Sequence, residues 1–365
     1  MISSRQLMLI VALSRLSVIF VFMPVVTGAD ALQDAWLAVI LATAAGALFG
    51  AAAAHLATRF PDDTFGTFAR DVLGTIPGVV AATALGLFFY SLAIMRTRQL
   101  AFLLIATQLQ QAPSWVFATT MILGAIYGTY LGPDAFGRAA EILFTLIVAS
   151  ILVGVVLLPI AVPMDVRLLQ PVLARGLEPI LEASINPAFW FASSAATVLF
   201  LAKYTVDVKQ AVKSVVKGTL ISGSTLLLMA VLATVSLGPQ EARNQVSPLV
   251  SMARIIYIRD AIERLDLLAL NIWVLGLQFD AALFLLAATV ILADAWAVKS
   301  NSMLLLLGAG GLVVASLKVF DLFMIRQALT PEITGIVTLV LHVGIIGLTL
   351  VIAIVRGKGY QRDDE

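Results

Sequence analysis

Four charged residues lie deep inside apolar stretches of this 365-residue chain. Arg15 lies in the first stretch, and Arg96 and Arg98 lie in the third. Asp280, near the middle of the eighth, is the only acid at mid-depth and the natural counter-ion for one of these arginines. A charge at the centre of a bilayer costs about 2.5–3.5 kcal/mol or more, so each should face the protein interior and find a partner. The expected charge network is either a structural ion pair that fixes helix packing or a polar site for a zwitterion.

Small polar residues interrupt two of these stretches. Ser14 and Ser17 flank Arg15 in the first stretch, and Ser193 and Ser194 lie in the sixth. Transporters that interrupt two membrane helices place their binding site at the breaks, whereas small residues also allow close helix packing. The first interpretation predicts a ligand pocket at these serines, and the second predicts only tight contact.

Aromatic and histidine side chains add weaker signals. Tyr90 in the third stretch either packs or directs its hydroxyl toward a ligand. Trp36, Trp115 and Trp190 lie near predicted interfaces, where an aromatic belt is expected. His342 is alone in the last apolar stretch without an acidic neighbour, which favours packing over a proton site. The predicted ligand-binding residues are Ser14, Arg15, Ser17, Tyr90, Ser193 and Ser194.

The sequence lacks the motifs that enzymes of the common classes carry. It contains no phosphate-cradling glycine loop, no HExxH, no GxSxG and no paired catalytic carboxylates. It contains no cysteine, which excludes disulfides and thiolate metal sites. The net charge is only +1, so no nucleic-acid surface is indicated. We therefore expect no enzymatic activity, no cofactor and no metal site.

The elements that must position these residues are membrane helices. Hydrophobic residues make up 61% of the chain, charged residues 12%, and the mean hydropathy is +1.02. A bilayer core about 30 Å thick needs about 20 apolar residues for each helical crossing. Stretches of that length predict an all-α membrane protein with about ten transmembrane helices, near 6–27, 35–57, 77–108, 114–132, 136–162, 187–204, 214–238, 267–297, 302–320 and 333–356.

The order of the stretches predicts one polytopic membrane domain over residues 1–365. An even number of helices suits an inverted 5+5 repeat, with half-repeats at about 1–162 and 187–356 and breaks in helices one and six. Lysines at 203–217 and a charged tail place both termini in the cytosol. The predicted pocket lies between helices one, three, six and eight.

Several local patterns together resemble the B subunit of spore germinant receptors, the GerAB-type spore permease family of the amino acid–polyamine–organocation superfamily. The resemblance covers nearly the whole chain through the order and spacing of its patterns. Those patterns are Ile2-Ser3 with Gln6-Leu7, Pro24 with Asp34-Ala35-Trp36-Leu37, Arg96-Thr97 with Pro113, Gly132 through Arg138 and Glu141, Leu169 through Leu173 with Gly176 and Pro179-Ile180-Leu181, and Pro248 with Ala253-Arg254, Ile262 through Asp266 and Trp273.

The resemblance implies a LeuT-like fold and a role in sensing a small nutrient, typically an amino acid, in the inner membrane of a dormant spore. It also implies two protein partners, a larger A-type membrane subunit and a C-type lipoprotein. An α-carboxylate would suit the N-terminus of a half-helix, and an ammonium would suit exposed carbonyls of the preceding one.

The chain departs from the family's pattern at two points. Many members carry a glycine pair in the broken first helix, where this chain has Ser17 and Ile19. Many also carry a Gly-Glu pair in the sixth helix, where the nearest counterpart is Ala192-Ser193. The alternatives are therefore a receptor subunit, a proton- or sodium-coupled amino acid transporter, and a scaffold subunit with a vestigial pocket.

Overall fold

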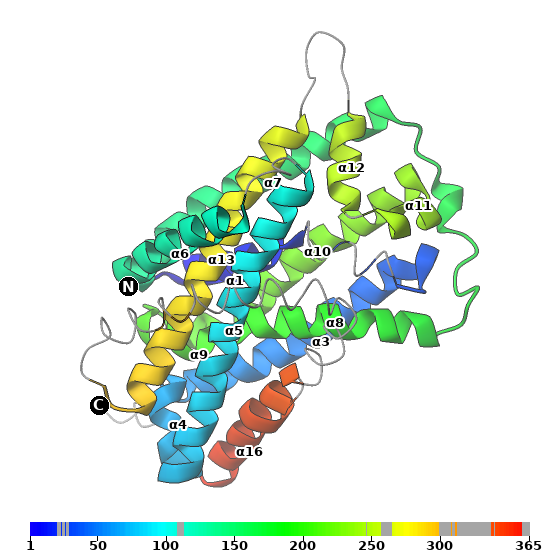
Figure 1. Ribbon diagram of the computed structural model, residues 1–365. Coiled ribbons are helices and arrows are strands. Elements are labelled where there is room, and N and C mark those ends of the chain that lie inside the picture. Colours follow the sequence, from blue (N-terminus) through cyan, green and yellow to red (C-terminus); the bar gives the residue numbers. More distant parts are fainter. Residues whose placement is uncertain are drawn as a thin grey trace.

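Helices build the part of the chain that the structure, a computed structural model, describes (Figure 1). This part comprises residues 1–19, 29–107, 113–245, 247–256, 265–298, 337–338 and 340–359, with the single positions 23, 26, 308 and 311. The first half of the chain forms α1 (Ser4–Leu16), η1 (Leu32–Asp34), α3 (Ala35–Thr58), α4 (Phe65–Leu73), α5 (Thr75–Thr107), α6 (Ser114–Leu131) and α7 (Pro133–Ala161).

The second half continues with helices of very different length. Two long helices, α10 and α13, alternate with short ones at the loops and at the helix breaks. The elements are η2 (Val166–Leu169), α8 (Glu178–Ala195), α9 (Val198–Leu201), η3 (Ala202–Tyr204), η4 (Val208–Gln210), α10 (Ala211–Leu237), α11 (Pro239–Asn244), α12 (Pro248–Ile255), α13 (Leu265–Ala295), the π-helix η5 (Val340–Gly347) and α16 (Leu348–Val355).

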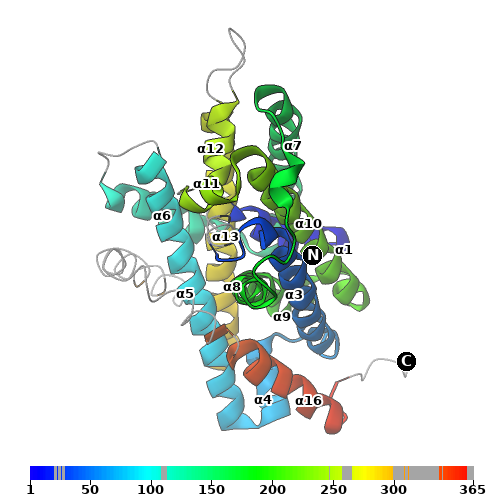
Figure 2. The same ribbon diagram turned by 90° about the vertical axis from the view of Figure 1, so that its right-hand side faces the viewer.

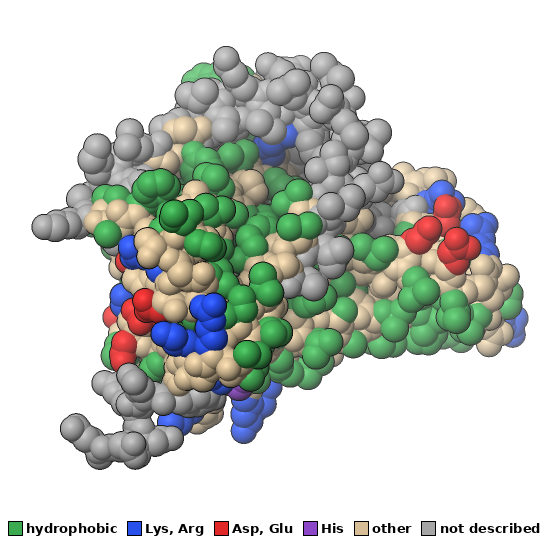
Figure 3. Space-filling model, turned by 90° about the horizontal axis from the view of Figure 1, so that it is seen from below, with side chains coloured by type: hydrophobic (Ala, Val, Ile, Leu, Met, Phe, Trp, Pro, Cys, Tyr) green, Lys and Arg blue, Asp and Glu red, His purple; other side chains and the backbone are tan. Residues whose placement is uncertain are grey.

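Among the residues that the structure describes, six helical segments are long and apolar enough to cross a membrane, which identifies an integral membrane protein. One of them, α7, buries only 11% of its apolar window inside the protein, as a lipid-facing helix does. In the view of Figure 3, hydrophobic side chains cover the middle of the molecule and charged ones gather mainly toward two ends. The predicted stretch 302–320 lies almost entirely outside the described residues, and 333–356 lies partly outside, so the count of ten helices stays a prediction.

Both predicted helix breaks are present. The first helix, α1, ends at Leu16 and turns at Ser17 and Val18, while α8 ends at Ala195 and turns before α9 begins. At each turn a side-chain hydroxyl donates to the backbone carbonyl three residues earlier. The hydroxyl of Ser17 lies 3.1 Å from the carbonyl oxygen of Ser14, and that of Thr197 lies 2.6 Å from the carbonyl oxygen of Ser194. Side-chain bonds of this kind offer the backbone an alternative to the helical ladder. The small polar residues therefore mark where both helices stop.

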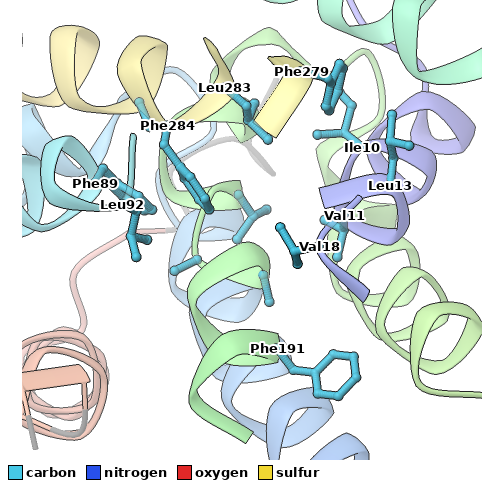
Figure 4. Close-up of a cluster of buried hydrophobic side chains, with 14 of the residues drawn as sticks. Ile10, Val11, Leu13, Val18, Phe89, Leu92, Phe191, Phe279, Leu283 and Phe284 are labelled. Atoms are coloured by element: carbon cyan, nitrogen blue, oxygen red, sulfur yellow. The ribbon is translucent and has the colours of Figure 1, made fainter. Parts of the chain in front are cut away.

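Long helices pack around the broken pair. The helix α13 runs along α5, α3 packs against α8 and α10, and α1 packs against α10 (Figures 1 and 2). The core where these helices meet includes many aromatic and branched side chains (Figure 4). Its labelled members are Ile10, Val11, Leu13, Val18, Phe89, Leu92, Phe191, Phe279, Leu283 and Phe284.

The N-terminus is tied to the far end of the interrupted sixth helix. The backbone of Ile2 pairs with the chain after η3, with bonds of 2.8 Å to Tyr204 and 3.0 Å from Val206. Ser3 and Gln6 form a capping box that starts α1, because each side chain bonds the other residue's backbone N–H. The opening pattern of the sequence thus fixes where the first broken helix begins.

Away from this N-terminal contact, the sequence pattern at Asp34 meets the pattern at 169–173. Asp34 is buried, and its carboxylate accepts the backbone N–H of Leu173 at 3.0 Å. Beside it, Gln33 donates to the carbonyl of Pro171 at 3.0 Å. The segment before α3 and the loop before α8 are therefore joined by hydrogen bonds, and Asp34, Pro171 and Leu173 belong to the patterns that resemble the family.

The close approach of α3 and α8 depends on a glycine. A Cβ added at Gly46 would overlap the side chain of Phe191 in α8, just before the break. We expect Gly46→Ala to lower the stability by about 1–3 kcal/mol, because overpacking forces side chains and backbone apart. The matched control is Gly154→Ala in α7, where an added Cβ meets nothing within 4 Å. Thermal unfolding of both variants measures the effect, and equal unfolding temperatures would contradict it.

Candidate functional site

The ends of the two broken helices meet α5 and α13 in a buried polar network. Ser14 and Arg15 come from the last turn of α1, and Ser194 comes from the last turn of α8. Arg96 comes from the second half of α5 and Asp280 from the middle of α13. Each of the five is at most 6% exposed. The network therefore joins the four helices that the sequence predicts for the pocket.

Asp280 pairs with Arg96. The Nε of Arg96 lies 2.5 Å from Oδ2 of Asp280, and the two side chains are 2% and 0% exposed. The guanidinium also donates to Gln99 over 2.8 Å and lies 5.5 Å from the centre of the Phe284 ring. A buried ion pair needs such additional partners, because desolvation of both charges opposes it.

The remaining bonds form a chain with a defined direction. The Nε–H of Arg15 donates to the hydroxyl of Ser194, and the hydroxyl of Ser14 donates to Asp280. The two hydroxyl oxygens lie 2.9 Å apart. Each hydroxyl has a single proton, so Ser194 must donate to Ser14 in this chain. Every bond is thus oriented from Arg15 toward the carboxylate of Asp280, and bonds in such a chain strengthen one another.

The charges of the described site residues are not balanced. Two guanidinium groups, of Arg15 and Arg96, belong to the polar network, and the described residues supply one carboxylate to it, that of Asp280. Arg15 interacts electrostatically with both, repelled by Arg96 and attracted by Asp280. A second negative charge next to Arg15 would therefore be favourable in this low-dielectric environment.

Two cavities lie beside the break of the first helix. The smaller one, of about 20 Å³, touches Arg15 and has Trp190 and Ser222 in its wall. Its volume suffices for about one water molecule. The larger one, of about 70 Å³, is mainly apolar and includes Trp273 in its lining. Ile19 lines both cavities.

The structure places the other predicted site residues around the network rather than in it. Ser17 donates to the backbone of Ser14, and Ser193 donates over 2.7 Å to the carbonyl of Phe189 in its own helix. The hydroxyl of Tyr90 donates over 2.5 Å to the carbonyl of Gly308.

Arg98 is half-buried on another face of α5. Residues two apart on a helix do not face the same way, so it points away from the direction of Arg96. The predicted charge network therefore divides, with Arg15, Arg96 and Asp280 in the polar chain and Arg98 beside it.

Three residues of the site are not among the predicted ligand-binding residues. Gln99 supports Arg96 from the next turn of α5, and its spacing of three residues was a usable signal. Trp190, predicted near a membrane interface, lines the cavity beside Arg15. Ser222 reaches the same cavity from α10, a helix outside the predicted pocket.

The fold resembles solved transporters. Mhp1, a nucleobase-cation-symport-1 family transporter with bromovinylhydantoin bound, aligns with a TM-score of 0.69 over 96% of this chain and 77% of its own, at 12% identity. MhsT in complex with L-phenylalanine aligns with a TM-score of 0.64 over 95% of this chain and 87% of its own, at 14% identity. The chain therefore has the LeuT fold, with helices one and six interrupted.

Sequence relatives come from spore-forming bacteria. Spore germination protein KB of Bacillus subtilis (strain 168) is 25% identical over 320 residues, which cover 87% of this chain and 85% of that protein. Spore germination protein YndE of the same organism is 24% identical over 245 residues, or 67% of each chain. Residues 1–321 match the spore permease family, described as "Spore germination protein". With most of its length matched, the chain belongs to this family of spore germination proteins.

Proposed function

We propose that this chain is the B-type subunit of a nutrient germinant receptor in the spore inner membrane. Membership of the spore germination family over residues 1–321 supports this role. A and C subunits would complete the receptor, and both termini of this chain would face the cytosol.

The proposed ligand is a small germinant with a carboxylate, such as an amino acid. The observation that carries this proposal is the polar chain from Arg15 through Ser194 and Ser14 to Asp280. It lies at two helix breaks, and its described members are two cations, Arg15 and Arg96, and one anion, Asp280. A carboxylate at Arg15 balances the charge and gains a charge-assisted hydrogen bond. Carbonyls at the end of α8 offer acceptors for an ammonium group.

Signalling would follow from a change in the polar chain. The cavity beside Arg15 holds about one water as it stands, so a ligand requires the helices around it to move. A ligand carboxylate would draw Arg15 toward the cavity and away from Ser194, which weakens the link between α1 and α8. A ligand shifts a two-state equilibrium only through different affinities for the two states. The proposed states therefore differ in the separation of the two breaks.

A secondary transporter is the second candidate. The observation that favours it is the fold, since the solved structures that it resembles are transporters. The absence of an acid in 178–204 beyond Glu178 and Glu182, both before the break, disfavours proton coupling through the sixth helix.

Reconstitution separates the two candidates. The purified chain in liposomes is expected to accumulate no amino acid against its gradient under a proton or sodium gradient. Deleting its gene should delay germination with one particular nutrient, and deleting either partner gene should cause the same delay. Gradient-driven accumulation together with normal germination of the deletion strain would instead establish the transporter.

A further inference from the structure

Two lysines share the outward face of α10 near its beginning. Lys213 and Lys217 are exposed and one helical turn apart, and a third exposed lysine, Lys209, lies four residues earlier in η4. Residues four apart on a helix lie on the same face, about 6 Å apart along the axis. Residues 208–240 contain no aspartate or glutamate. The first turns of α10 therefore carry positive charges on one face and no acid.

Along the same face, α10 becomes apolar. Leu220 and Leu228 are 47% and 40% exposed. A helix turns by about 100° per residue, so both leucines lie within about 60° of Lys217 around the axis. They belong to the segment Val208–Leu237, which is long and apolar enough to cross a membrane. The exposed leucines therefore contact lipid chains, and the lysines lie at the end of this lipid-facing surface, at the depth of the headgroups.

Packing on the other side of α10 holds this face outward. A Cβ added at Gly218 would collide with the backbone of Met8 in α1, and one at Gly223 would collide with the side chain of Thr43 in α3. A rotation of α10 that turned the lysines inward would break both close contacts. The outward direction of the two lysines is therefore fixed by the fold and not by the choice of side-chain rotamer.

Other basic side chains at helix ends bond to the protein itself. Arg59 and Arg356 donate to backbone carbonyls of distant segments over 2.9 and 3.0 Å. Among the described residues, no hydrogen bond or ion pair involves the ammonium group of Lys213 or Lys217. The general bias of lysine and arginine toward one side of a membrane explains their side, but not why they line one exposed face. Their charges are directed at the surroundings of the protein.

We propose that the lysine face of α10 binds the headgroups of anionic phospholipids. The lysine face comprises Lys209, Lys213 and Lys217. An ammonium group is attracted to an anionic headgroup, whereas a zwitterionic headgroup carries its own cation and attracts a lysine less. The acyl chains of the bound lipid lie along Leu220 and Leu228. Because α10 packs closely on α1, bound lipid also fixes the depth of the first broken helix in the membrane.

Native mass spectrometry of the purified chain tests the proposal. The protein in a neutral detergent is offered equal amounts of phosphatidylglycerol and phosphatidylcholine with identical acyl chains. We expect a preference of about 10- to 30-fold for phosphatidylglycerol. The preference should fall when ammonium acetate is raised from about 0.15 M to about 1 M, because the Debye length shortens from about 8 Å to about 3 Å. Equal occupancy by the two lipids would overturn the proposal.

The double variant Lys213→Gln/Lys217→Gln assigns the preference to this face. We expect it to lower the preference by about tenfold and to leave the unfolding temperature in detergent unchanged, since both side chains are exposed. The matched control, Arg5→Gln/Lys358→Gln, removes the same net charge from exposed positions outside α10 and should keep the preference. An equal loss in both variants would overturn the proposal, because only the net charge would then be sensed. Binding of poly-glutamate to this face without any lipid preference would also overturn it, and would assign the face to an acidic protein partner.

Discussion

Replacement of Asp280 by asparagine is expected to destabilise this protein by about 3–5 kcal/mol. The carboxylate is fully buried and accepts bonds from Arg96 and Ser14, so its loss leaves a buried guanidinium without its counter-ion. Thermal unfolding of the purified variant in detergent measures the loss.

A double-mutant cycle assigns the effect to the pair. Adding Arg96→Gln to Asp280→Asn should recover part of the lost stability, with a coupling of about 0.5–3 kcal/mol. The matched control is Arg98→Gln, which removes the same charge from a half-buried position two residues along the same helix. Its effect should add to that of Asp280→Asn. Additive effects for Arg96→Gln as well would show that the pairing does not contribute to stability.

Arg15→Gln is expected to reduce the sensitivity of germination to the nutrient by about 10- to 100-fold. A hydrogen bond to a charged group contributes about 1.5–3 kcal/mol, and each 1.4 kcal/mol changes affinity about tenfold. The glutamine amide can still donate to Ser194, so α1 and α8 keep one link. Dose–response curves of spore germination, at matched amounts of protein in the spore membrane, measure the shift.

The control for this variant is again Arg98→Gln, which removes an intramembrane charge outside the polar chain. We expect a dose–response curve close to that of the unmodified protein. Equal shifts for the two variants would mean that the net charge of the membrane region is sensed, and would remove the basis for a carboxylate site at Arg15.

The sequence was sufficient to predict where the membrane helices break and which helices meet there. Charged side chains inside the membrane need a partner, and small polar residues mark the points where a membrane helix is interrupted. Both rules can be applied from the residue types alone. The bounds of α5 and α13 differ from the predicted 77–108 and 267–297 by at most two residues. These features follow from the length and the apolar composition that a helix needs to cross a bilayer.

The choice of partner within each pair could not be predicted in the same way. Arg96 and Arg98 occupy the same apolar stretch, and only the rotation of α5 about its axis decides which one faces Asp280. Ser193 and Ser194 differ by 100° about α8, and only Ser194 reaches the polar chain. Helix rotation is set by packing, for example by the contact of Gly46 with Phe191, and that contact joins residues far apart in the chain.

Side chains near helix breaks were the hardest to place. Trp190 lies about one turn before the break of α8, where its position in the sequence suggests a membrane interface. The interruption brings this end of the helix into the protein, beside the cavity at Arg15. The hydroxyl of Tyr90, a predicted ligand contact, bonds the carbonyl of Gly308, a position with no polar side chain to signal that bond.

The central claim is that the site at Arg15 recognises a carboxylate, and binding by the unmodified protein tests it most directly. The measurement is the thermal stabilisation of the purified chain by a panel of amino acids and by the corresponding amino acid amides. A ligand at 100 times its Kd stabilises by about 2.7 kcal/mol. We predict that at least one free amino acid raises the unfolding temperature with its concentration, and that its amide does not. Equal stabilisation by acid and amide, or none across the panel, would contradict the claim.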